Sequence, residues 1–382
     1  MLKSFLLEYI QLMKMHLSRY KKKLMPHMVF LPVLILVISL GIVSIHFSHA
    51  ASAFVSSEAE SGTLSGSATV VTASGTSGGK YVAFGSASSP SSSGLFPSSN
   101  FDKPVIQSMA LSPNSSTYVN DFVNDYKNNY GAVAVNELPI FTVPANQPMI
   151  PVGVNSGCGN FTPSTGTSIP IPVSAYTTSA TYQNDSAMII YQPSTNSDWE
   201  LWQATKSSSG SWSACWGGKL SPSTSNGVFP NGYGLSGSGI SYLALTITEN
   251  DIASGAINHA IAVDLPACNG PQVLPADRTD CGSDPGQPPE GTMYRFPSSL
   301  TMPSGLTPFG QMVFTAIQKY GMVQTDQAGA VALQAETTQD WTTEGHTGTD
   351  PITQSWAGEQ EYQVVANLPW SDMQVVQPPS SW

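Results

Sequence analysis

Short apolar runs, each bounded by turn residues, recur along most of the chain after residue 100. Because these runs are rich in β-branched and aromatic residues, we expect strands at residues 138–143, 150–154, 187–192, 199–204, 211–216, 240–247, 257–265 and 293–296. The pattern excludes a long coiled coil or a helical bundle, which needs charged and Ala- or Leu-rich heptads. We therefore predict an all-β fold, built as one large β-sandwich of the jelly-roll or lectin/glucanase-like kind.

Two helices are expected at the edges of this sandwich. The first begins after Asn114, continues with apolar and aromatic residues at helical spacing, and ends at Gly131. The second spans residues 308–320, with Pro308 near its start and Gly321 directly after it. We also expect residues 322–324 and 330–335 to pair as a hairpin around Ala328 and Gly329.

Charged residues make up only 10% of the 382 residues, compared with about 25% in an average soluble domain. Six of the 14 basic residues precede residue 51, so the remainder has 8 basic and 24 acidic residues. A nucleic-acid partner is not expected, because the remainder is acidic and has no basic stripe.

The N-terminal 50 residues have the pattern of an export segment. A basic cluster at residues 19–23 precedes an uncharged apolar run at residues 28–45, and Ser48-His49-Ala50 follows. This order is typical of a signal peptide with its cleavage site. The run is also long enough to span a bilayer, so an uncleaved signal anchor is the alternative. In both cases we expect the remainder to be secreted or extracellular, touching a membrane only through this segment.

The four cysteines all lie in the exported part. An even number of cysteines in an oxidising compartment predicts two disulfides, for which three pairings are possible. We favour Cys268–Cys281, which closes a loop rich in Pro, Gly and Asp, and Cys158–Cys215. The chain contains no C-x-x-C motif, so we expect no metal site of the zinc-ribbon type and no thioredoxin-type redox site.

Residues 51–85 form a short strip with strand-like runs between Gly-rich turns. Glu58-Ala59-Glu60 opens the strip, and Ser77-Gly78-Gly79 precedes its last run. The strip resembles the first strands of β-sandwich carbohydrate-binding modules that open with E-A-E. In that family the first-strand carboxylates help to hold a structural calcium. Here Ala73-Ser74 stands where an Asp often precedes S-G-G, so we expect no cofactor.

A Ser- and Pro-rich linker at residues 86–99 follows, and the body spans residues 100–382. Several stretches of the body resemble a family of exported proteins of the actinobacterial type: Trp199-Glu200-Leu201-Trp202, Trp216-Gly217-Gly218, Asn258-His259-Ala260, Arg278-Thr279-Asp280, Pro289-Glu290-Gly291 and Tyr320-Gly321-Met322. The resemblance implies export and a β-sandwich, and it assigns no catalytic residues.

Four of the eight Trp residues fall between positions 199 and 216. Because side chains alternate on a strand, Glu200 and Trp202 are expected on one face and Trp199 on the other. A carboxylate beside an indole suits a sugar site, where the ring stacks on the sugar and the carboxylate binds hydroxyl groups. We therefore expect sugar contacts from Trp202, Trp212 and Trp216; the alternative is that these rings pack in the core.

Few side chains in the body can perform acid–base chemistry. The candidate catalytic residues are Glu200, His259, Arg278 and Asp280. His259 could act as a general base, or instead be a hydrogen-bonded core residue. Arg278 could bind a uronate carboxylate, or instead pair with a neighbouring Asp and fix its loop.

Three hypotheses follow for the function. The first is an exported, monomeric glycan-binding or cell-surface protein whose partner is a polysaccharide or cell-wall glycan. The second is a secreted glycoside hydrolase or polysaccharide lyase that uses Glu200, His259 and Arg278. The third is a structural surface protein without a small ligand. Convergence of these polar residues in one cleft would favour the second.

Overall fold

The computed structural model describes residues 69–72, 80–83, 94–155, 168–177, 185–230, 233–339, 341 and 348–382. The chain divides into two compact units, Met1–Ala87 and Ser88–Trp382. In the first unit, β1 (Thr69–Thr72) and β2 (Lys80–Ala83) pair in antiparallel fashion. The predicted export segment lies outside the described residues. Among the residues that are described, no helix has the length and hydropathy needed to cross a membrane.

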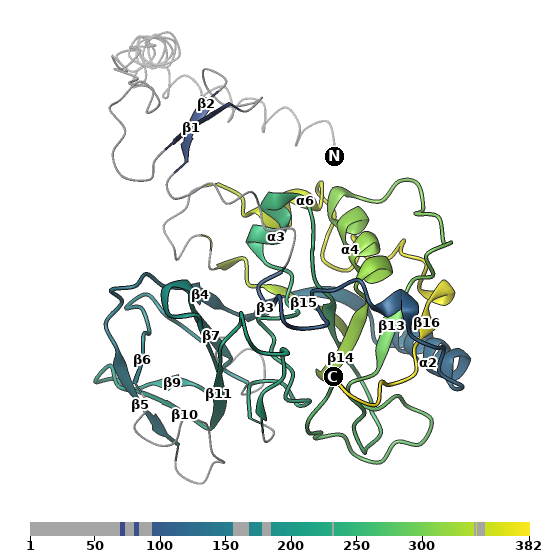
Figure 1. Ribbon diagram of the computed structural model, residues 1–382, viewed down its shortest axis with the longest axis horizontal. Coiled ribbons are helices and arrows are strands. Elements are labelled where there is room, and N and C mark those ends of the chain that lie inside the picture. The colour runs from purple at the N-terminus through teal and green to yellow at the C-terminus, as the bar shows by residue number, and fades with distance from the viewer. Residues whose placement is uncertain are drawn as a thin grey trace, which may run out of the picture. The chain divides into compact units, whose positions relative to one another are not determined.

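Two four-stranded sheets form one part of the second unit (Figure 1). The first, in the order β11-β8-β7-β4, contains β4 (Ile140–Thr142), β7 (Met188–Gln192), β8 (Ser197–Trp202) and β11 (Trp216–Leu220). The second, in the order β6-β5-β10-β9, contains β5 (Ile150–Val154), β6 (Ser168–Ile169), β9 (Thr205–Lys206) and β10 (Trp212–Ala214). Apolar side chains of both sheets, including Phe141, Trp199 and Trp212, form one shared core. The two sheets therefore make a small β-sandwich.

A six-stranded mixed sheet forms the other part, in the order β16-β13-β14-β12-β15-β3. Its strands are β3 (Gly131–Leu138), β12 (Ile261–Leu265), β13 (Met293–Arg295), β14 (Met322–Gln327), β15 (Val331–Glu336) and β16 (Gln374–Val375). The pairs β12–β14 and β15–β3 are parallel, and the other pairs are antiparallel.

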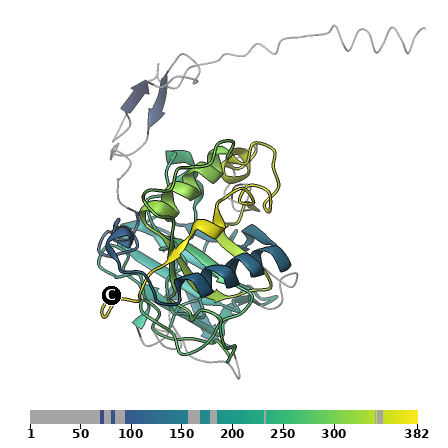
Figure 2. The same ribbon diagram turned by 90° about the vertical axis from the view of Figure 1, so that its right-hand side faces the viewer.

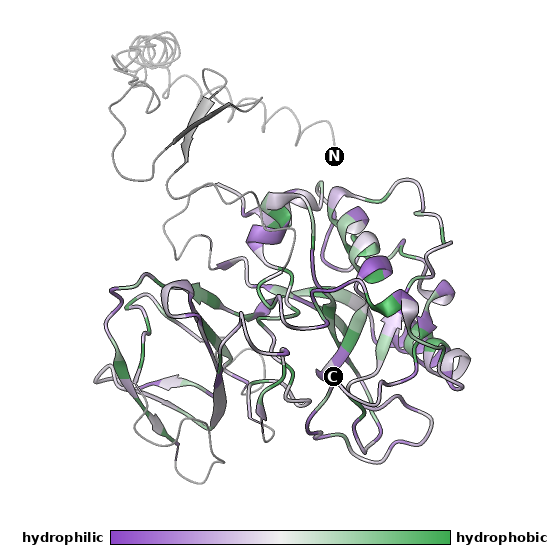
Figure 3. Cartoon of the chain, in the orientation of Figure 1, coloured by the Kyte–Doolittle hydropathy of each residue, from purple (hydrophilic) through white to green (hydrophobic). Residues whose placement is uncertain are grey.

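Helices α2 (Ser115–Asn128) and α4 (Pro308–Lys319) cover one face of this sheet. Helix α2 packs beside β16 (Figure 2), and α4 contacts β13. Hydrophobic and hydrophilic residues alternate along α4 (Figure 3), and its apolar side chains join the core beneath it. Two short α-helices, α3 (Glu249–Ser254) and α6 (Pro351–Ser355), are also present, together with the 3-10 helices η3 (Ile106–Ser108), η4 (Pro193–Thr195) and η6 (Trp370–Asp372).

Strand β12 shows how the sheet separates core from cavity. Ile261, Val263 and Leu265 point toward the helices and join their core. Ala262 packs on the opposite side, and Asp264 is the next residue that points that way. A register shift after Val263 places Asp264 opposite Asp326 on β14. The face away from the helices thus receives two carboxylates from adjacent central strands.

The predicted mainly β character is confirmed, and both expected helices are present close to their expected bounds. The predicted hairpin of β14 and β15 is wrong, because β12 lies between these strands and pairs with both. The strand expected at residues 240–247 is an irregular buried segment, and the strand expected from residue 257 begins at Ile261. The sheets also contain parallel pairs, which an antiparallel jelly roll lacks.

The disulfide between Cys268 and Cys281 is confirmed. Cys215 is also disulfide-bonded. Its predicted partner, Cys158, lies outside the described residues. The first disulfide closes a loop with a sequence separation of 13 residues, and this loop contains Arg278 and Asp280.

The backbone at Gly291 lies so close to the backbone of Val273 that there is no room for a side chain. Its φ is +86°, and a Cβ atom there would lie 1.9 Å from the carbonyl oxygen of Val273. Gly286 also has a positive φ, +100°, but a Cβ atom there would have no neighbour within 4 Å.

We predict that Gly286→Ala lowers the free energy of unfolding by about 1–2 kcal/mol, the cost of the left-handed backbone alone. Gly291→Ala should lower it by a further 1–3 kcal/mol or so, because the backbone around Val273 must move. Urea unfolding of the two variants measures both values. Equal destabilisation would contradict the close approach at Gly291.

Candidate functional site

A cavity of about 500 Å³ lies between the face of the six-stranded sheet that is turned away from the helices and the ends of β8 and β11. Strands β3, β12 and β14 of the large sheet supply its acidic side, β8 and β11 supply two indoles, and loops close the remainder. Its lining includes Glu137, Asp264, Asp326, Gln334, Trp202, Trp216, Asp185, Gly237, Tyr242, Arg278 and Asp280.

The acidic side is held together by side-chain hydrogen bonds. The carboxylate of Asp264 accepts hydrogen bonds from the hydroxyl groups of Thr325, at 2.6 Å, and Tyr242, at 3.0 Å. The side-chain amide of Gln334 donates to Asp264 and also, at 3.1 Å, to Glu137. Burial raises the pKa of Asp264 to about 7. Burial also raises the pKa of Glu137. The hydrogen bond from the Gln334 amide lowers this pKa in part, and the negative charge of Asp185 raises it further.

The indole side is polar at its rim. The half-buried ring of Trp202 donates its N–H to a carboxylate oxygen of Asp185 at 3.1 Å. Trp216 stacks on Tyr233 with ring centroids 5.6 Å apart and an interplanar angle of 23°. The guanidinium carbon of Arg278 lies 5.4 Å from the centre of the Trp216 ring, within cation–π range. A nitrogen of the same guanidinium donates to the carbonyl oxygen of Ser236.

The structure brings together four of the residues expected from sequence. Arg278, Asp280, Trp202 and Trp216 all line the cavity. Trp212 lies instead in the sandwich core with 4% of its surface exposed. Glu200 and His259 are buried outside the residues that line the cavity. Glu200, His259 and Arg278 therefore do not converge in one cleft, so the structure does not favour a hydrolase or lyase that uses these three residues.

Glu200 stabilises the irregular segment at residues 240–247. Its carboxylate accepts hydrogen bonds from the hydroxyl of Ser241, at 2.7 Å, and from the backbone N–H of Leu243, at 3.0 Å. Ser241 also donates to the adjacent Asp198 at 3.2 Å. Burial raises the pKa of both carboxyls, that of Glu200 to about 7. These contacts fasten the irregular segment at residues 240–247 to β8.

His259 forms an ion pair with Asp251 in α3, with 3.2 Å between the imidazole Nε2 and the carboxylate. Its Nδ1 lies 2.7 Å from the carbonyl oxygen of Ala260. Burial disfavours the charged imidazole, but the carboxylate of Asp251 outweighs it, and the pKa of His259 rises to about 9. Asp102 adds to this rise. The histidine thus joins α3 to the residues that precede β12.

Four residues of the acidic cavity were not among the sequence candidates: Glu137, Asp185, Asp264 and Asp326. Their signal was weak, because each is a lone acid in or beside an apolar run. The clearest signal is that of Asp264, which stands within Ile261-Ala262-Val263-Asp264-Leu265, because a carboxylate inside such an apolar run is unusual. Their convergence depends on strand order, which a single sequence does not reveal.

Comparison of the chain with protein-family models, with curated proteins and with solved structures gave no match. The resemblances to a carbohydrate-binding module and to an exported protein family therefore stay predictions.

The ion pair of His259 predicts a specific pH dependence. The folded pKa of about 9 exceeds the ordinary value of 6.5, so its contribution to stability is complete below about pH 6.5 and is lost as the pH rises through 9. A shift of this size corresponds to about 3 kcal/mol. We expect the unfolding free energy of the wild type to exceed that of His259→Gln by an amount that falls between pH 6.5 and 9. Urea titrations across this range test it; a difference independent of pH would show that the charge of His259 contributes nothing.

Proposed function

We propose that the protein is an exported glycoside hydrolase whose cavity binds a sugar beside Trp202 and cleaves it with Glu137 and Asp185. The observation that carries this proposal is the juxtaposition of two carboxylates and an indole in one cavity. Such a combination of apolar wall, few convergent polar groups and a carboxyl with a raised pKa is typical of an active site.

Trp202 is the better stacking surface of the two cavity indoles. Its ring is half-buried and lines the cavity, whereas the ring of Trp216 is engaged by Tyr233 and Arg278. A pyranose ring offers a C–H face that packs well on an indole. The hydrogen bond from Trp202 to Asp185 holds the carboxylate at the edge of that ring, where it would meet a sugar hydroxyl or the anomeric carbon.

Glu137 is suited to the role of general acid. Burial raises its pKa, so a larger share of its carboxyl groups carries a proton near neutral pH. The amide of Gln334 fixes its position and joins it to Asp264 beneath. Asp185 is exposed and close enough to contribute to the pKa of Glu137, so it can act as the second carboxylate, either as base or as nucleophile.

Arg278 extends the site toward charged sugars. Its guanidinium is held by Ser236 and Trp216 and lines the same cavity. A guanidinium binds a carboxylate through two parallel hydrogen bonds, so a uronate or another acidic sugar would offset the negative charge of the surrounding acids.

The second candidate is glycan binding without turnover. The Trp202 face and the Arg278 guanidinium favour it, because both can bind sugar without any proton transfer. Under this alternative Glu137 and Asp185 accept hydrogen bonds from sugar hydroxyls.

We predict that the purified full-length protein releases reducing ends from at least one polysaccharide in a panel that includes neutral and uronate-containing glycans. Glu137→Gln should lower kcat by about 10²–10⁴-fold, the usual contribution of a general acid. Asp372→Asn, which changes an exposed acid outside the cavity, is the matched control and should keep full activity. Binding on a glycan array without turnover would leave the second candidate, and the absence of both would overturn both.

A second prediction concerns the stacking surface. Trp202→Ala should weaken glycan binding by about tenfold, because the apolar face for the sugar is lost. Trp202→Phe keeps an aromatic face but cannot donate a hydrogen bond to Asp185. It should therefore retain most of the binding, with a lower kcat and a KM that changes little. Calorimetric binding beside initial rates separates these effects. Unchanged binding in Trp202→Ala would exclude Trp202 from the site.

A further inference from the structure

Three acidic side chains from distant parts of the chain meet at Gly237. One carboxylate oxygen from each of Asp280, Glu290 and Asp326 lies within 4.8 Å of the other two. A Cβ atom at residue 237 would lie 2.6 Å from the oxygen of Glu290 and 2.8 Å from those of Asp280 and Asp326. The missing side chain of Gly237 therefore leaves a small space that three oxygens face.

Glu290 is the least satisfied member of this group. It has 0% of its surface exposed, and neither carboxylate oxygen accepts a hydrogen bond of normal geometry from the described residues. Burial raises its pKa to about 8; nearby Asp280 adds to the rise, which the hydroxyl of Thr279 opposes only in part. Among the residues that the structure describes, no Lys, Arg or His forms an ion pair with any of the three acids. An uncompensated buried carboxylate is costly unless a proton or a cation accompanies it.

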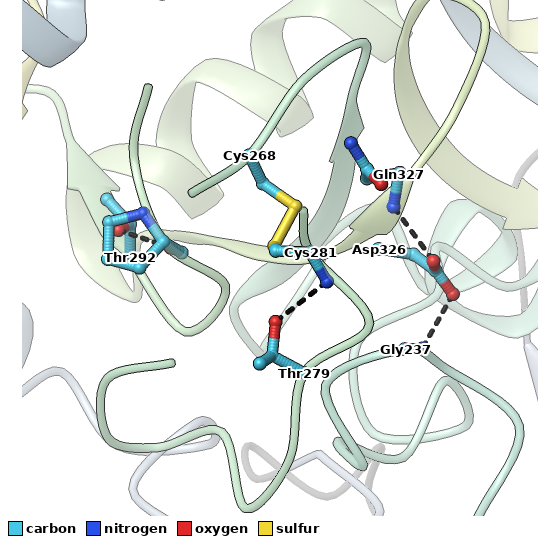
Figure 4. The surroundings of a disulfide bond; sticks show 8 residues. Gly237, Cys268, Thr279, Cys281, Thr292, Asp326 and Gln327 are labelled. Atoms are coloured by element: carbon cyan, nitrogen blue, oxygen red, sulfur yellow. Dashed lines mark hydrogen bonds between the residues drawn. A yellow bond between two sulfur atoms is a disulfide. The ribbon is translucent and has the colours of Figure 1, made fainter. Parts of the chain in front are cut away.

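The three ligand groups are held in place by separate constraints. Asp326 accepts hydrogen bonds from the backbone N–H groups of Gly237, at 2.7 Å, and Gln327, at 2.8 Å (Figure 4). Asp280 directly precedes Cys281. The disulfide from Cys281 to Cys268 fixes this loop, and the backbone N–H of Cys281 donates a hydrogen bond to the hydroxyl of Thr279. This preorganisation lowers the entropy that a bound ion would otherwise cost.

We propose that Asp280, Glu290 and Asp326 form a binding site for a divalent cation, namely Ca²⁺, in the wall of the cavity. The unpartnered carboxylate of Glu290, aimed at a space that two further carboxylates also face, carries this proposal.

The donor set selects among metals. Cys268 and Cys281 lie beside Glu290, but their sulfur atoms are joined in a disulfide and offer no thiolate, so only oxygen ligands are present. Zn²⁺ prefers nitrogen and sulfur ligands. Mg²⁺ requires oxygens at about 2.0–2.1 Å and retains most of its water, whereas Ca²⁺ accepts 6–8 oxygens at about 2.3–2.6 Å in a flexible arrangement. Water from the cavity can complete its shell, because Asp280 and Asp326 line that cavity.

The cation would contribute to the cavity in two ways. It would neutralise part of the charge of three acids in a body with few basic residues. It would also fix the position of Asp280 relative to β14. Asp280 is exposed and belongs to the loop that carries Arg278. The inference does not rest on sugar turnover, since it concerns acids other than Glu137 and Asp185.

The test is calorimetric titration of CaCl₂, and separately of MgCl₂, into the full-length protein after treatment with EDTA. We expect Ca²⁺ to bind more tightly than Mg²⁺ and to raise the melting temperature, because it binds only the folded state. Glu290→Gln should lower the affinity at least about tenfold, since it removes one charged ligand. A titration with Tb³⁺, read by luminescence on indole excitation, gives a second signal because Trp202 and Trp216 line the same cavity.

Two glycine variants keep the test decisive if Glu290→Gln folds poorly. Gly237→Ala retains all three carboxyl groups but fills the space between them, and should also weaken Ca²⁺ binding at least about tenfold. Gly329→Ala is the matched control, because a Cβ atom there would have no neighbour within 4 Å. No Ca²⁺ binding by the wild type would overturn the proposal. So would binding that both Glu290→Gln and Gly237→Ala leave unchanged, which would place the ion elsewhere.

Discussion

At least four groups of acidic side chains lie wholly or partly buried in the described part of this protein, while the chain after residue 50 provides only 8 basic residues for 24 acidic ones. Each group of acids is stabilised differently. Asp198 and Glu200 accept hydrogen bonds from Ser241 and a backbone amide. Asp264 and Glu137 share the amide of Gln334. Asp251 pairs with His259. Asp280, Glu290 and Asp326 differ from these groups, because no hydroxyl, amide or imidazole among the described residues bridges their carboxyl groups.

The sequence predicted those parts of the fold that depend on local periodicity. The two main helices follow from apolar spacing and from the Pro and Gly residues at the ends of α4. The alternation of β8 was also correct, since Trp199 enters the sandwich core while Trp202 reaches the cavity. The loop disulfide followed from compartment and spacing.

The candidate site was predicted only in part, because its geometry is not local. Glu137 and Asp264 are far apart in sequence and meet through Gln334, since β12 and β3 flank β15 in the sheet. Sequence proximity suggested a hairpin of β14 and β15, whereas the actual pairing inserts β12 between them. His259 was selected for its chemistry alone, and its neighbour Asp251 explains it as a buried ion pair. Rarity of a residue type therefore identified titratable groups but not their roles.

The Cys268–Cys281 disulfide has a practical consequence for how the molecule is made. It closes the loop that carries Arg278 and Asp280, so two wall residues depend on a covalent bond that reducing conditions remove. The large sheet and its helices have no cysteine in their core. In a reducing cytoplasm the apolar core of the large sheet would keep its contacts, whereas the loop of Arg278 and Asp280 would lose its covalent closure. Material for any study of ligands should come from an oxidising host or from oxidative refolding.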